Sequence, residues 1–265
     1  PDSQPEAIGG YLPLSKVYSF NPVPDTLSAE KVGLVYGVQA NLFTEYIPTP
    51  EHAEMMIYPR VLALAEVAWS APSKKNYEDF HVRALKAVEE LKKSGYNPFE
   101  LKNEIGNRPG ADKPVEHLAV GKKVTYGLDA AYYPGYAAGG DTALVDGVRG
   151  GWTYGDKRWQ GFIDKKRMDI TIDLEKETEL HFIGADFMQV CGPEVFMPAE
   201  VIISISDDGK DFTELKHIEH KVVKDDKVTF TNFGWEGNAK GRYVRYQATS
   251  GKFGGFLFTD EVVIK

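Results

Sequence analysis

The chain has 265 residues and a mass of 29.5 kDa, with 42% hydrophobic and 26% charged residues, enough for one large or two smaller globular domains. Its formal net charge is −8, and its lysines and arginines are scattered along the sequence, which excludes nucleic acid as the expected partner. No apolar run approaches the roughly 20 residues of a membrane span, and the single cysteine, Cys191, excludes an internal disulfide.

The first third of the sequence combines a proline-rich segment with one apolar run. Residues 1–30 contain five prolines, too many for a long regular element, and we expect a long ordered loop there. Residues 34–43, LVYGVQANLF, are mostly apolar without helical spacing, which predicts a strand buried on both faces. An acid, Glu45, follows this strand two residues after the aromatic Phe43.

Two helices are predicted next. The first runs from an N-cap at Thr49, with Pro50 in the first turn and a kink at Pro59, to Trp69, which we expect in the core. The second covers residues 77–95, with acids in its first turn, lysines in its last and a glycine just past its end.

Helical spacing disappears after residue 110, and short strands with turn signals take over. This pattern predicts an antiparallel β-sandwich, with a turn at the DDG of residues 207–209. The predicted strands cover residues 168–174, 179–187, 200–215, 226–233, 241–250 and 254–265. The loop-like stretch 103–114 marks the boundary, so we expect two domains, over residues 1–110 and 111–265.

The N-terminal part is not a complete fold by this pattern. A single parallel-type strand with two helices has no partners for its backbone groups, so it is typical of the end of a larger α/β unit such as a (β/α)8 barrel. Reactive groups of such barrels lie at the C-terminal ends of the strands. Glu45 occupies that place, which suggests that it faces a substrate.

The stretch GVQANLFTEYIPTPEHAEMMIYPRVLALAEVAWS, residues 37–70, together with PEAIGGYLPLSKVYSFNPVP, residues 5–24, strongly resembles the last barrel segment of the glycoside hydrolase family 20 β-N-acetylhexosaminidases. The resemblance implies that Glu45 accepts hydrogen bonds from hydroxyls of the terminal N-acetylhexosamine. Phe43 would take the place of an aromatic wall that is usually Trp in the family. Phe keeps the apolar face but loses the indole N–H.

The catalytic pair of this family is absent from the chain. The family's Asp–Glu pair lies in a His-x-Gly-Gly-Asp-Glu motif. The GGD at 139–141 does not provide it, because Thr142 follows and we interpret the stretch as a turn, and the acid pair at 260–261 does not, because adjacent strand residues point to opposite faces. The resemblance implies a parent enzyme with a substrate-assisted retaining mechanism, without a catalytic cofactor, in the periplasm or secreted. We expect the 265-residue chain alone to be inactive, with the catalytic residues upstream of Pro1, which we take as a cut end.

The C-terminal half resembles the discoidin-like, coagulation-factor-type C sandwich, a galactose-binding jelly roll. The stretches that carry this resemblance are 118–126, 139–162, 201–212 and 241–246, with the closing FLFTDEVVIK. In sugar-binding members it implies a structural Ca²⁺, with Asp146 and Glu261 as ligands and backbone carbonyls of residues 139–144 completing an oxygen shell. The competing interpretation is that Asp146, which precedes Gly147, only forms a turn.

Aromatic residues in the loop-like stretches of this half are candidates for stacking on a sugar ring. They are Tyr136, Trp152, Tyr154 and Trp235. Packing inside the protein would use the same residues, and Trp159 is expected in the core between the sheets.

Three hypotheses therefore stand. The chain is the C-terminal part of an exo-β-N-acetylhexosaminidase that acts on glycans with a terminal β-N-acetylhexosamine, or a carbohydrate-binding accessory module, or a carrier of a purely structural sandwich. Its expected partners are the missing N-terminal part of the barrel and, for the unpaired flanks of the strand at 34–43, either a second copy in a homodimer or the sandwich of the same chain.

Overall fold

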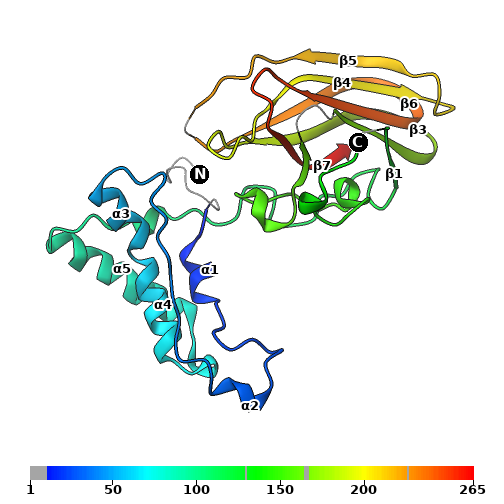
Figure 1. Cartoon of the computed structure of the whole chain (residues 1–265). Helices are drawn as coiled ribbons and strands as arrows, with labels where there is room; N and C mark the ends of the chain where they lie inside the picture. The colour runs from blue at the N-terminus through cyan, green and yellow to red at the C-terminus, as the bar shows by residue number, and fades with distance from the viewer. Residues whose placement is uncertain (1–10, 129, 164–166, 226) are drawn as a thin grey trace. The chain divides into compact units, whose positions relative to one another are not determined.

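A computed structural model describes residues 11–128, 130–163, 167–225 and 227–265. The described residues divide into two compact units, a helical unit over Tyr11–Gly106 and a β unit over Asn107–Lys265 (Figure 1). The first ten residues of the loop predicted over 1–30, and residue 226 at the start of one predicted strand, lie outside the described residues. No helix among the described residues is long and apolar enough to span a membrane.

The helical unit consists of short helices joined by irregular segments. Its α-helices are α1 (Leu14–Tyr18), α2 (Ala29–Val32), α3 (Pro50–Ile57), α4 (Arg60–Trp69) and α5 (Tyr77–Lys93). Two 3₁₀ turns, η1 (Pro72–Lys74) and η2 (Leu101–Asn103), complete it. The loop predicted over residues 1–30 thus contains two short helices, α1 and α2, in its described part.

Local sequence signals set the helix ends, and those at Thr49, Pro59 and Gly95 were expected from the sequence. The Thr49 side chain accepts the backbone N–H of His52 at 3.2 Å, and the predicted kink at Pro59 is a break between α3 and α4. In α5, Asn76 caps the first turn by accepting the N–H of Asp79 at 3.2 Å. Gly95, just past the end, has a φ of +88°, which glycine adopts without steric cost.

A small core and one ion-pair network hold the helices together. The buried residues come from α1, α4, α5 and η2; they are Leu14, Tyr18, Ala63, Val67, Phe80, Ala84, Val88 and Leu101. Arg83 on α5 donates to both carboxylate oxygens of Glu66 on α4, at 2.6 and 2.8 Å, and the hydroxyl of Tyr18 on α1 donates to the same carboxylate. This network lowers the pKa of Glu66.

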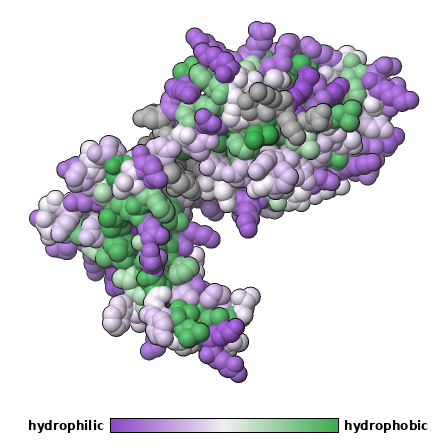
Figure 2. All heavy atoms as spheres, in the orientation of Figure 1, coloured by the Kyte–Doolittle hydropathy of each residue, from purple (hydrophilic) through white to green (hydrophobic). Residues whose placement is uncertain are grey.

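The strand predicted over residues 34–43 does not form, and this prediction was wrong for the structure of this chain. The segment is irregular, with Tyr36 92% and Phe43 66% exposed. The described residues of the helical unit contain no strand that could pair with it, so no ladder of backbone hydrogen bonds can hold it as a strand. Trp69, expected in the core, is 91% exposed at the end of α4 for the same lack of a covering element. Figure 2 shows apolar residues gathered at the surface of this unit.

The β unit is built from antiparallel strands, as predicted. The strands are β1 (Lys123–Tyr126), β2 (Gln160–Ile163), β3 (Met168–Gln189), β4 (Pro198–Ser206), β5 (Thr213–Glu219), β6 (Thr229–Ser250) and β7 (Phe256–Ile264). Three 3₁₀ turns lie in the loops before β2, namely η3 (Pro134–Tyr136), η4 (Ala143–Val145) and η5 (Tyr154–Asp156).

The strand order is β2-β7-β3-β6-β4-β5, with β1 also paired to β3. The two long strands β3 and β6 pair along their length, with register shifts between Asp173 and Thr178 and between Leu180 and Phe182. One half of β3 pairs with β1 and the other half with β7. The long, bent pair of β3 and β6 therefore contributes to both layers of the sandwich (Figure 1). The strands predicted separately at 168–174 and 179–187, and at 226–233 and 241–250, are thus single long strands.

The sandwich core is large and continuous. Its central cluster takes residues from every long strand; among its fully buried members are Phe162, Ile170, Ile172, Ile183, Phe187, Ile203, Val244, Tyr246, Leu257 and Val262. A second cluster contains Trp159, which is 1% exposed, with Met188, Val190, Val195 and Phe258. The expected core position of Trp159 is therefore confirmed. The turn at 207–209 is also confirmed, with Gly209 at a φ of +73°.

Candidate functional site

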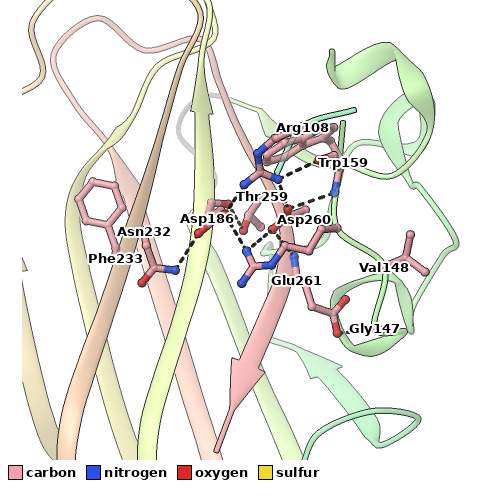
Figure 3. Close-up of polar contacts among 12 residues, drawn as sticks. Arg108, Gly147, Val148, Trp159, Asp186, Asn232, Phe233, Thr259, Asp260 and Glu261 are labelled. Carbon is pink, nitrogen blue, oxygen red and sulfur yellow. Dashed lines mark hydrogen bonds and ion pairs between the residues drawn. The ribbon is translucent and has the colours of Figure 1, made fainter. Parts of the chain in front are cut away.

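The acid pair of β7, Asp260 and Glu261, lies at a β-bulge. Ala185 of β3 pairs with Val262 and Phe187 pairs with Thr259, so two residues of β7 oppose the single residue between them on β3. Both acid side chains are fully buried. Burial of two adjacent carboxylates requires partners for each, and the two acids find them in different places (Figure 3).

Asp260 belongs to a cluster of two arginines and two aspartates. Arg108 Nη1 donates to its Oδ2 at 2.9 Å, the backbone N–H of Gly150 donates to the same oxygen at 3.1 Å, and Arg149 lies 3.5 Å from Oδ1. Both arginines also pair with Asp186 of β3. Burial and the neighbouring Asp186 raise the pKa of Asp260 to about 6, against the opposing effect of the arginines.

Arg108 ties the segment that enters the β unit to the sandwich. Its guanidinium lies over the ring of Trp159, 5.1 Å from the centroid, and over that of Phe230, 4.7 Å away. It also donates to the carbonyl of Gly150 at 2.8 Å. The described contacts give this cluster a structural role, because the arginines compensate both carboxylates.

The side chain of Glu261 has other partners, and its two carboxylate oxygens differ in their hydrogen bonding. Its Oε1 lies 2.6 Å from His117 Nε2 and accepts the backbone N–H of Gly147 at 2.9 Å. Its Oε2 is buried and has no hydrogen-bond partner among the described residues. Burial raises the pKa of Glu261, His117 and Gly147 oppose that shift, and the charge of Asp146 adds to it.

Asp146 lies at the turn that leads to Gly147. Its Oδ1 accepts the backbone N–H of Val148 at 2.8 Å. Its Oδ2 lies beside Gly139, where an added Cβ would be 3.6 Å from that oxygen. Gly147 has a φ of +79°, which brings its N–H toward Glu261.

Two of these residues carry oxygen donors of the kind that Ca²⁺ binds. An unpartnered buried carboxylate oxygen on Glu261 and a second carboxylate on Asp146 are the hard oxygen donors that Ca²⁺ takes. Among the described residues no group of three or more His, Cys, Asp and Glu side chains could hold a metal, so backbone carbonyls and water would have to supply the remaining ligands. The sequence-predicted pair Asp146 and Glu261 would hold it.

The loop expected to supply those carbonyls, 139–144, is held by several hydrogen bonds. The carbonyl of Gly140 accepts Gln160 Nε2 at 2.9 Å, and that of Thr142 accepts the N–H of Val145 at 3.0 Å. Tyr132 donates its hydroxyl to Asp141 at 2.8 Å. The loop is therefore fixed to β2 and to the preceding tyrosine before any ligand binds.

Three of the four candidate aromatics pack around one aromatic cluster. The ring of Tyr136 lies 5.8 Å from Tyr154 and 4.9 Å from Phe258, and Trp152 lies 5.7 Å from Phe230. Trp235, on β6, packs instead against the central core. All four are half-buried. Part of each side chain contacts protein neighbours and part contacts solvent.

The two candidates in the helical unit, Phe43 and Glu45, lie on the irregular segment before α3. Both are exposed, and Glu45 is in a turn with no hydrogen bond or ion pair among the described residues. The structure places no other candidate residue beside them.

Sequence reasoning missed Arg108, His117, Arg149 and Asp186. Arg108 lies in the stretch 103–114 interpreted as the domain boundary, and His117 lies between that stretch and residue 118. Asp186 lies in a predicted strand, where its polar side chain gave no separate signal. The available signal was Asp260 with Glu261 inside an otherwise apolar terminal strand, since two buried acids require basic partners.

The β unit matches a known domain family. The F5/8 type C domain model matches residues 129–262, half of the chain. The chain belongs to the F5/8 type C domain family. The F5/8 type C domain thus accounts for the antiparallel sandwich and includes both Asp146 and Glu261. Residues 1–72 match a second model, the catalytic domain of glycosyl hydrolase family 20, which covers most of the helical unit.

The chain is similar to two curated proteins over part of their length. It is 45% identical over 97 residues to a beta-hexosaminidase of Porphyromonas gingivalis, covering 37% of this chain and 12% of that protein. It is 32% identical over 74 residues to a beta-N-acetylhexosaminidase of Cellulomonas fimi, covering 28% and 15%. The chain therefore spans less than a fifth of the length of either relative.

Two solved structures are similar to part of the chain. A fucose-binding module of Streptococcus pneumoniae, SpX-3, is 20% identical, with a TM-score of 0.41, covering 57% of this chain and 98% of that module. Chitosan-binding module 1 from a chitosanase/glucanase of Paenibacillus sp. IK-5 is 15% identical, with a TM-score of 0.39, covering 57% and 98%.

Proposed function

We propose that the chain is the C-terminal part of an exo-acting β-N-acetylhexosaminidase whose catalytic barrel is completed by further sequence. The observation that carries this proposal is the ordered motif of residues 37–70 inside the match to a family 20 catalytic domain over residues 1–72. The two relatives named as hexosaminidases support it. The substrate would be a glycan with a terminal β-N-acetylhexosamine.

In the complete enzyme, the substrate's own acetamide would attack the anomeric carbon and form an oxazolinium intermediate, with retention of configuration. The acid and the aspartate that orients the acetamide would come from outside this chain. Glu45 would accept hydrogen bonds from the sugar hydroxyls, and Phe43 would offer an apolar face to the ring. Exposure of both residues in this chain is consistent with a pocket completed by other barrel segments. No cofactor is required for this chemistry.

The rest of the barrel is the partner that the helical unit lacks. Large apolar side chains that are exposed here would be covered by it; they are Leu34, Tyr36, Phe43 and Trp69. A homodimer through the same side chains is the alternative, and light scattering of the 265-residue chain distinguishes a monomer from a dimer. A periplasmic or secreted location fits an enzyme that acts on glycans.

For the F5/8 type C domain we propose a carbohydrate-binding accessory role, with Ca²⁺ held by Asp146 and Glu261 as a structural ion. The half-buried rings of Tyr136, Trp152 and Tyr154 support it, because each keeps part of its surface in contact with solvent. The competing role is purely structural, and the ring contacts of Tyr136 favour it. A glycan array with and without Ca²⁺ separates the two, because a structural domain would give no binding in either condition.

Hydrolysis of a chromogenic β-N-acetylglucosaminide by this chain and by its complete parent protein tests the enzymatic proposal. We expect turnover by the parent only. Turnover by the short chain would contradict the assignment of the acid to other sequence, and no turnover by either protein would leave the accessory-module function in its place.

A further inference from the structure

We propose that His117 is a positioning residue that orients Glu261 toward a bound cation and is not itself a ligand. This inference rests on the calcium role proposed above. The two imidazole nitrogens of His117 have different hydrogen-bond partners.

Backbone donors occupy one side of the ring. The N–H of Ala119 points at Nδ1 from 3.3 Å, and the N–H of Ile264, on β7, points at it from 3.4 Å. An Nδ1 that accepts from backbone groups carries no proton, so the ring proton lies on Nε2. His117 Nε2 then donates to Glu261 Oε1 at 2.6 Å.

The carboxylate of Glu261 is thereby made asymmetric. Oε1 accepts from both His117 and the backbone N–H of Gly147, at 2.6 and 2.9 Å, whereas Oε2 has no partner among the described residues. Rotation of the carboxylate would break both bonds to Oε1. Glu261 is therefore held as a ligand that offers one oxygen, Oε2.

Three separate segments fix this arrangement. His117 precedes β1, Gly147 follows η4 and Glu261 lies on β7. The side chains of His117 and Glu261 are completely buried, so water does not compete for their hydrogen bond. Both imidazole nitrogens are engaged, which leaves His117 no lone pair for a metal. Outer-shell partners of this kind change metal affinity by about 10- to 100-fold when they are replaced.

The test compares three variants of the full 265-residue chain by calorimetric titration with CaCl₂ after treatment with EDTA. His117→Leu removes the hydrogen bond, and His117→Gln retains an N–H donor on a longer flexible side chain. His217→Leu is the matched control, because His217 is an exposed histidine that also lies beside a glutamate, 3.0 Å from Glu200. Thermal unfolding in EDTA measures the loss of stability separately from the loss of affinity.

We expect His117→Leu to bind Ca²⁺ at least 10-fold more weakly than the native chain. His117→Gln should recover most of the affinity, and His217→Leu should match the native chain. Equal affinity of His117→Leu and the native chain would overturn the positioning role while the calcium site stands. Absence of calcium binding by the native chain would overturn the calcium proposal and this inference together. If His117→Leu has no cooperative unfolding transition, His117→Asn, which stays polar but ends nearer the backbone, takes its place with the same expected loss.

Discussion

Arg108 Nη1 donates to Asp260 Oδ2 at 2.9 Å, and this bond joins residues 152 positions apart in the sequence. It connects the first segment of the sandwich to its last strand. Asp186 and Arg149 complete a cluster in which two positive and two negative side chains meet beside the ring of Trp159. The cluster is one of the polar contacts that attach the segment before β1 to the fold, together with the bond between His117 and Glu261.

Replacing Arg108 should therefore destabilise the sandwich. Arg108→Met would leave the buried Asp260 and the partly buried Asp186 with Arg149 as their only cationic partner among the described residues, and removing one member of a buried ion pair costs about 3 kcal/mol. Denaturant unfolding followed by hydrogen exchange of the β7 amides would measure this loss. Arg158→Met is the control, because Arg158 is exposed and makes a 3.3 Å bond to the carbonyl of Ala111. Equal stability of the two variants would contradict the structural role of the cluster.

Acid should weaken the β4–β5 hairpin through Asp208. This carboxylate accepts the backbone N–H groups of Lys210 and Asp211, at 2.8 and 3.0 Å, and these bonds lower its pKa to about 2. A lowered pKa stabilises the fold above the unfolded value of about 3.8 and loses that contribution as pH falls toward 2. The carboxyl carbon of Asp208 should titrate near pH 2 by NMR. A midpoint close to 3.8 would show that the turn does not use the charged form.

The stability of Asp208→Asn should fall less steeply than that of the native chain between pH 4 and pH 2. Hydrogen exchange of the β4 and β5 amides at both pH values gives the comparison. Identical pH dependence of the two proteins would contradict the expected linkage.

Glu45 should matter for catalysis in the complete enzyme and not for the fold of this chain. Because its side chain is exposed without an ion pair among the described residues, Glu45→Gln should leave the unfolding temperature unchanged. In the parent enzyme the same change should lower kcat/KM by about 10²-fold, since fixed hydroxyl contacts restrain the sugar while the acetamide attacks. An unchanged kcat/KM would refute this role.

Substitutions of Tyr136 distinguish a packing role of the loop aromatics from a role in binding glycan. Its ring contacts Tyr154, Phe256 and Phe258, so Tyr136→Ala should cost about 2 kcal/mol of unfolding free energy for a half-buried aromatic. Tyr136→Phe keeps the ring and should lose less than about 0.5 kcal/mol. If Tyr136→Ala instead remained as stable as the native chain and lost glycan affinity, the ring would be a sugar platform rather than part of the packing.

Much of the fold follows from the sequence because its signals are local. The caps at Thr49 and Asn76, the glycine after α5 and the turn at Gly209 act within a few residues of each element. Alternating apolar residues located β3, β4, β6 and β7. The full length of β3 and β6 escaped prediction, because a bulge interrupts the alternation while the ladder continues on both sides of it.

The predictions that were wrong concern residues whose structure depends on spatial neighbours that are distant in the sequence. The apolar run 34–43 has the composition of a buried strand, but a strand needs a neighbour for its backbone groups, and the helical unit provides none among its described residues. Trp69 is exposed for the same reason. In the sandwich, Asp146 and Glu261 were identified through the family resemblance, whereas the bond from His117 depends on a contact across 144 residues of sequence.

The N–H of Leu118 donates to the carbonyl of Ile264 at 2.8 Å, so the segment just before β1 lies beside the end of β7. A linker from Lys265 to Asn107 would close the sandwich into a ring that retains Arg108 and His117, and opening this ring at the exposed turn between β4 and β5 would give a circular permutant. Such a protein would keep the His117–Glu261 contact while its chain began and ended on another side.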